Sequence, residues 1–258
     1  MGRRYRKLLL ELKKMGYPAK IYLYLLLFIA TVIGMKYVVE TRLPSGGRPP
    51  YLFLVWNTFL AWIPVGLAVM LDLIHVGMRS KTLKVLLLLG FGLIWLFFYP
   101  NAAYLLTDLL HPFNRYPIES DFWWENTFWN HLFTVLFTAL LGLILGSVSL
   151  ASVHGLVRRS FGGVAGWAFA VIVLLLSSFG VYLGRFMRWN SWDILQEPLH
   201  VLKDTAVYFQ DLNNLTHAVS FCKWIFLITL FSYVVMYMFR AVKEQREDVK
   251  NGRKEALQ

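Results

Sequence analysis

The sequence predicts an all-α protein, a polytopic bundle of about six transmembrane helices with interfacial helices or loops on the non-cytoplasmic side. First, 57% of the 258 residues are hydrophobic and only 16% are charged, whereas soluble domains carry about 25% charged residues. Second, the apolar residues gather in runs close to the ~20 residues that cross a bilayer. Third, most Lys and Arg residues flank these runs on one predicted side, as topology determinants do.

The apolar runs define the expected helices and the division of the chain. In chain order they are residues 20–38, 51–74, 84–106, 128–151, 164–186 and 219–239. The fourth run contains Gly142 and Gly146, and this GxxxG spacing predicts close helix packing. The chain is therefore divided into a basic cytoplasmic lead (1–19), a six-helix transmembrane domain (20–239) and a charged cytoplasmic tail (240–258).

The distribution of basic residues predicts the orientation. The lead, the connections after the second and fourth runs, and the tail hold most of the 26 Lys and Arg residues. Because such residues are retained in the cytoplasm, both termini are predicted to be cytoplasmic.

Charge and cysteine content exclude several classes. A net charge of +11 and a pI near 9.8 would suggest nucleic acid as the partner of a soluble protein. Here the charge lies beside apolar runs, so the predicted partners are membrane lipids and not nucleic acid. The single cysteine, Cys222, excludes an intramolecular disulfide and a thiolate zinc cluster. The N-terminus has no small-residue cleavage site after a short apolar core, so no removable signal peptide is expected.

The stretch Tyr99–His111, YPNAAYLLTDLLH, ends the third apolar run with a cluster of polar residues. In a continuous α-helix, Asn101, Tyr104, Asp108 and His111 would share one face within roughly 80°. A proline at position 100 predicts a kink or a restart of the helix. Polar groups at this depth are costly unless paired, which favours function; the alternative is that Asp108 caps a helix and His111 lies among the headgroups.

A second polar motif, GRFMRWNSWD at 184–193, ends the fifth run. Arg185 and Arg188 lie one turn apart, and the planar guanidinium suits bidentate capture of carboxylate or phosphate. Asn190 or Ser191 is expected to cap a new helix that has Asp193 in its first turn. In the alternative interpretation the two arginines extend to the interface and Asp193 only caps.

A divalent metal is the cofactor that these residues suggest. Asp108 and His111 at i, i+3 would need a third ligand, and His131 is the candidate, since imidazole and carboxylate together suit Zn, Mn or Fe. The alternative is that His131 is a hydrogen-bonded structural residue. Asn57 either completes this polar cluster or bridges two helices. Near the cytoplasmic end of the second run, Asp72 and His75 are expected to form an interfacial pair, with a role in transport as the alternative.

Three separated motifs resemble a known family. PNAAYLLTDLLH, preceded by WNTFLAWIP and followed by GRFMRWNSWD, is similar to a bacterial family of multi-pass membrane proteins catalogued as domain of unknown function 1361. The resemblance covers about residues 50–200, and Ala103 departs from the proline expected in many members. It implies a bacterial inner-membrane protein and brings no established activity.

The leading functional hypothesis is an enzyme whose outward-facing site acts on a lipid-linked or other anionic envelope substrate. Asp108 and His111 would supply acid–base or metal-ligand chemistry, Arg185 and Arg188 would hold the anion with Asp193 nearby, and the substrate would be oriented by Asn57, Asn101, Tyr104 and Asn190. The alternatives are a non-catalytic envelope scaffold or sensor and a small transporter. Residues 194–218 form either an interfacial helix or a lid.

Overall fold

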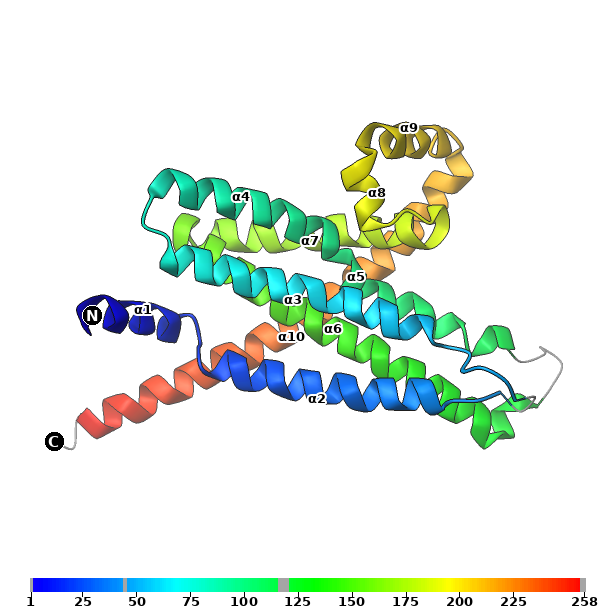
Figure 1. The fold of residues 1–258 in the computed structure, drawn as a ribbon, viewed down its shortest axis with the longest axis horizontal. Helices are drawn as coiled ribbons and strands as arrows, with labels where there is room; N and C mark the ends of the chain where they lie inside the picture. Colours follow the sequence, from blue (N-terminus) through cyan, green and yellow to red (C-terminus); the bar gives the residue numbers. More distant parts are fainter. Residues whose placement is uncertain (1, 44–45, 116–120, 256–258) are drawn as a thin grey trace.

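The computed structural model describes residues 2–43, 46–115 and 121–255, and every regular element in these ranges is a helix. Six helical spans within them are long and apolar enough to cross a membrane, which confirms the predicted bundle of transmembrane helices (Figure 1). The side chains of residues 2–4, 195, 240 and 243–255 lie outside this description. The charge of the predicted tail 240–258 is therefore known from the sequence alone.

The long helices follow the six apolar runs. They are α2 (Ala19–Glu40), α3 (Phe53–Gly77), α4 (Lys81–Phe98), α6 (Asn126–Phe161), α7 (Gly163–Tyr182) and α10 (Leu212–Glu255). Two of them, α6 and α10, extend far beyond the apolar runs that predicted them. α6 continues past residue 151 because Ser152, Val153 and His154 remain buried against its neighbours, and α10 continues into the predicted tail.

Shorter helices fill the remaining chain. They are α1 (Gly2–Lys14), α5 (Pro100–Tyr104), the 3₁₀ helices η1 (Leu105–Leu110), η2 (Phe113–Arg115) and η3 (Phe122–Trp124), the π-helical turn η4 (Leu183–Met187), α8 (Ser191–Gln196) and α9 (Pro198–Tyr208). Residues 194–218 therefore consist of the end of α8, all of α9 and the start of α10. Leu199 and Leu202 of α9 are 80% and 66% exposed, an apolar surface of the kind expected for an interfacial helix.

Both chain termini lie at the same end of the bundle, together with the α3–α4 and α6–α7 connections (Figure 1). This end is called the basic pole, because it carries Arg79, Lys81, Lys84, Arg158 and Arg159. The opposite end is called the loop pole, and it holds the described parts of the connections 41–52, 105–125 and 183–211. The basic side chains therefore gather where the sequence predicted them to be.

α6 is the central helix of the bundle. In its most apolar window 61% of the residues are buried, compared with 11% for the span that begins with α4. α6 packs against α2, α3, α5, α7 and α10, whereas α4 exposes Leu86, Leu89 and Leu93. These exposed leucines on an outer helix are suited to contact with hydrocarbon rather than with water.

Candidate functional site

The stretch Tyr99–His111 is a broken helix and not a continuous one. α4 ends at Phe98, Pro100 begins α5, and η1 follows with 3₁₀ geometry. The predicted break at Pro100 is confirmed, because proline lacks the N–H that would continue the α4 hydrogen bonds. The expectation that four polar residues share one face of a single α-helix is wrong, since residues 105–110 turn at about 3.0 residues per turn.

Three glycines make room for this broken helix. A Cβ atom on Gly142 would collide with the carbonyl oxygen of Ala102, and one on Gly146 would lie 3.3 Å from the Ala102 Cβ. On the other side, a Cβ on Gly180 of α7 would lie 2.6 Å from the Pro100 ring. The GxxxG pair thus packs closely, as predicted, and its partner is the interrupted segment α5.

Asp108 is the centre of the polar cluster at the loop pole. Its side chain is 1% exposed, and its Oδ2 atom accepts a 3.0 Å hydrogen bond from the Asn57 amide of α3. His111 Nε2 lies 3.5 Å from Oδ1, and the guanidinium of Arg185 lies 4.0 Å from the same atom. The 3₁₀ turn explains the first of these contacts, because residues i and i+3 eclipse each other in that geometry.

The two arginines of the second motif separate. η4 carries Arg185 towards Asp108, whereas Arg188 is exposed, adopts a left-handed conformation with φ of 61° and makes no ion pair within the described residues. This conformation ends the helix, and α8 begins three residues later, at Ser191. Asp193 accepts hydrogen bonds from the Asn190 backbone N–H at 2.7 Å and from the Asn190 side-chain amide at 3.1 Å. Of the two predicted caps, Asn190 is therefore the N-cap of α8, and Asp193 completes the capping box.

A cavity of about 120 Å³ with both polar and apolar walls lies next to Asn57, and Asp108, His111 and Arg185 are not among its lining residues. Its walls include Asn57, Asn101, Tyr104, Asn190 and Ser191, so four residues that the sequence assigned to substrate orientation surround one space. The Asn101 amide donates to Ser191 Oγ at 3.0 Å and to the Phe98 carbonyl at 2.9 Å. Asn57 links the cavity to the carboxylate, because it lines the wall and also donates to Asp108.

One buried polar atom adjoins the same cavity. The indole N–H of Trp189, a lining residue, is buried and has no hydrogen-bond partner among the described residues. An unsatisfied buried donor costs about 1–3 kcal/mol, so a ligand or a water that accepts this hydrogen bond would be stabilised here.

His131 does not join Asp108 and His111. Its Nδ1 lies 3.1 Å from the Tyr51 hydroxyl and its Nε2 lies 3.0 Å from the Arg42 carbonyl. Within the described part of the chain, no group of three His, Cys, Asp or Glu side chains is placed to hold a metal ion. Its contacts therefore agree with the alternative that His131 is a hydrogen-bonded structural residue.

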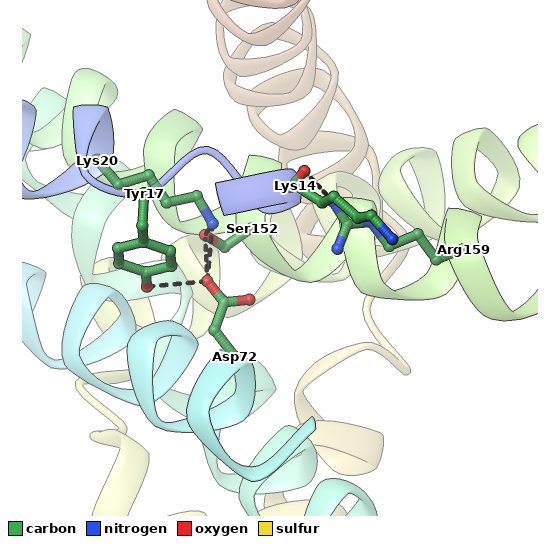
Figure 2. A network of polar contacts seen from close by, with 6 residues as sticks. All are labelled: Lys14, Tyr17, Lys20, Asp72, Ser152 and Arg159. Carbon is green, nitrogen blue, oxygen red and sulfur yellow. Dashed lines mark hydrogen bonds and ion pairs between the residues drawn. The ribbon is translucent and has the colours of Figure 1, made fainter. Parts of the chain in front are cut away.

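A second buried carboxylate, Asp72, lies near the basic pole. It is 0% exposed and pairs with Lys20 at 2.7 Å, while the Tyr17 hydroxyl donates to the same Oδ2 at 3.1 Å. Ser152 of α6 completes the group, since its hydroxyl lies 2.6 Å from Lys20 Nζ (Figure 2). The expected interfacial pair of Asp72 with His75 is wrong, because the carboxylate turns inward to Lys20 and forms no ion pair with His75 in the described structure.

This cluster ties the N-terminal segment to three helices. Figure 2 shows Tyr17 and Lys20 converging on Asp72, with Arg159 of α6 donating to the Lys14 carbonyl nearby. Burial and the neighbouring Asp72 carboxylate raise the pKa of the Tyr17 hydroxyl above its usual value. Asp72 lies inside an apolar run, and a carboxylate there requires a partner. The run itself does not show that this partner is Lys20.

Comparison with known proteins adds one match. Residues 56–238 match the family model described as protein of unknown function (DUF1361), so both polar motifs lie inside the matched region. No curated protein and no solved structure matches the chain.

Proposed function

The chain belongs to the family of proteins of unknown function DUF1361, and from its polar cluster we propose an integral-membrane enzyme that acts on an anionic, lipid-linked envelope substrate. One observation carries the proposal: the buried Asp108 carboxylate is approached by Asn57, His111 and Arg185, and Asn57 also lines a cavity. We place this site on the non-cytoplasmic side, because basic residues gather at the opposite pole.

His111 is the general acid–base in this proposal. A buried carboxylate beside one imidazole nitrogen fixes the ring orientation, so the other nitrogen exchanges the proton with the substrate. Asp108 Oδ1 faces Nε2 at 3.5 Å, and the Phe53 ring packs against the imidazole with centroids 4.6 Å apart. The imidazole is 29% exposed, so it is held on one side and open on the other.

Arg185 is the residue that binds the anion. Its Nη1 atom stands 4.0 Å from Asp108, which is longer than a hydrogen-bonded ion pair, and its side chain is 20% exposed. The guanidinium is therefore positioned by the carboxylate without a short bond to it. A phosphate or carboxylate of the substrate can engage the remaining N–H groups in a bidentate manner.

The size of the cavity limits what enters it. About 120 Å³ is smaller than the 300–1,000 Å³ of a site that encloses a whole small molecule. Only the reacting group would enter, with Asn57, Asn101 and Tyr104 providing polar walls, while the lipid portion stays in the membrane. Asn190 and Asp193 act indirectly, because their cap holds Ser191 against Asn101.

The test is lipid and envelope-glycan profiling of the source organism with the gene deleted, then complemented with variants. We expect one envelope component to change on deletion, wild type to restore it, and His111→Gln and Arg185→Gln to fail at normal membrane abundance. The matched control is Arg79→Gln, which neutralises an exposed arginine at the basic pole and should restore the profile. An unchanged profile on deletion, or full restoration by His111→Gln, would overturn the proposal.

A non-catalytic scaffold is the second candidate, favoured by one observation. Both oxygens of Asp108 already have protein neighbours, as in a structural ion-pair network. In that case Asp108→Asn and Arg185→Gln would lower membrane abundance and thermal stability together. Loss of function at wild-type stability would argue against the scaffold.

A further inference from the structure

A second cavity, of about 490 Å³, opens between α2 and α6 at the loop pole. It shares no lining residue with the smaller cavity next to Asn57, and Asp108, His111 and Arg185 do not line it, so it is a separate space. Both of its walls are membrane-spanning helices, and a groove between such helices is open to lipid. The groove is apolar in its inner half and polar in its outer half.

The inner half of the groove is apolar. Gly34 of α2 faces the Phe137 ring of α6, and a Cβ atom on this glycine would lie 3.0 Å from the ring. Phe133 and Phe137 both line the groove and are 55% and 41% exposed. Gly34 itself is buried beneath the Phe137 ring, so a hydrocarbon chain would lie along the exposed faces of Phe133 and Phe137 and cover apolar surface at about 25 cal/mol per Å².

The outer half of the groove is polar and carries both signs of charge. Glu40 and Arg42 line the α2 wall, and Thr127 and Asn130 line the α6 wall. From Gly34 to Glu40, the last residue of α2, the helix covers about 9 Å at the α-helical rise, so the apolar and polar halves of the groove lie at different depths. The guanidinium of Arg42 donates through Nη1 to the Thr41 carbonyl at 2.9 Å, and it has further N–H donors.

We propose that this groove binds one zwitterionic glycerophospholipid with an amine-bearing headgroup. The phosphate is held by Arg42 and the ammonium by Glu40, and the Thr127 and Asn130 side chains face the glycerol region. One acyl chain follows the exposed rings of Phe133 and Phe137. Glu40 Oε1 lies 3.9 Å from Lys36 Nζ in an exposed pair, and such pairs are weak, so a headgroup ammonium can take the place of Lys36. An anionic headgroup would engage Arg42 and bring no cation to Glu40.

Native mass spectrometry of the purified full chain provides the test. The protein is titrated with phosphatidylethanolamine and, separately, with phosphatidylglycerol of the same acyl chains. We expect one phosphatidylethanolamine to bind roughly tenfold more tightly than phosphatidylglycerol, the effect of one charge-assisted contact. Glu40→Gln should remove this preference, Arg42→Gln should weaken both lipids, and Gly34→Leu should weaken both by filling the apolar half.

Matched controls separate the groove from general lipid contact. Gly90→Leu on the exposed face of α4 adds the same side chain where nothing lies within 4 Å, and Lys81→Gln removes a charge at the basic pole. Both should bind phosphatidylethanolamine as wild type does. Should Gly34→Leu not fold, Phe137→Leu probes the same wall. Equal affinity for the two lipids, or unchanged selectivity in Glu40→Gln, would overturn the proposal.

Discussion

The ion pair between Asp72 and Lys20 is predicted to be a major source of stability at the basic pole. At 2.7 Å the Coulomb attraction amounts to about 6 kcal/mol at an effective dielectric constant near 20, and desolvation of both groups offsets much of it. Breaking such a pair leaves one charge buried. Lys20→Met should therefore lower the free energy of unfolding by about 3–5 kcal/mol.

A double-mutant cycle isolates the interaction. Asp72→Asn should cost less than Lys20→Met, because the Lys20 side chain is already 13% exposed and its ammonium can move towards the interface. The double variant should be more stable than the sum of the single losses predicts, with a coupling energy of about 1–3 kcal/mol. Denaturant titration in detergent micelles, followed by circular dichroism, measures all four proteins. A coupling energy below about 0.5 kcal/mol would refute the reasoning.

Three further predictions concern other contacts. Gly142→Leu should cost at least about 1–3 kcal/mol through collision with Ala102, visible as lost membrane abundance, while Gly90→Leu should be tolerated. The pKa of the Tyr17 hydroxyl is raised in the folded state, so its contribution to the free energy of unfolding is fully present below about pH 10 and is lost as the pH rises further. In alkaline titration the wild type should therefore lose stability more steeply than Tyr17→Phe. Asp193→Ala should cost about 1 kcal/mol as a lost cap, and Asp193→Asn should recover most of it in thermal melts.

The membrane helices could be predicted from the sequence because their signal is local. A run of apolar residues near bilayer length identifies a span whatever its neighbours are, and the proline at position 100 marks the break before α5 in the same way. The helix ends were harder to predict. α6 continues to Phe161 because burial of Ser152 and His154 depends on packing against other helices, which no local window contains.

The polar site could be predicted only where its residues are close in sequence. Asp108 and His111 are near in sequence, so their proximity could be expected, whereas the hydrogen bond from Asn57 joins residues 51 positions apart. The divergence of Arg188 from Arg185 arises from a single left-handed residue, and the sequence gives no glycine or asparagine there to signal it. Lys20 and Asp72, 52 positions apart, were missed because pairing across a bundle leaves no local pattern.

The two buried aspartates differ in a way that bears on function. Asp72 is held by short contacts, with the Lys20 ammonium at 2.7 Å and the Tyr17 hydroxyl at 3.1 Å. The His111 and Arg185 neighbours of Asp108 are distant by comparison, at 3.5 Å and 4.0 Å, and only its amide partner, Asn57, is close. A substrate that competes for the Asp72 pair would have to break a tight ion pair, whereas an anion near Arg185 would displace no short bond. The loop pole is therefore better suited to reversible binding of a substrate, and the basic pole is better suited to holding the helices together.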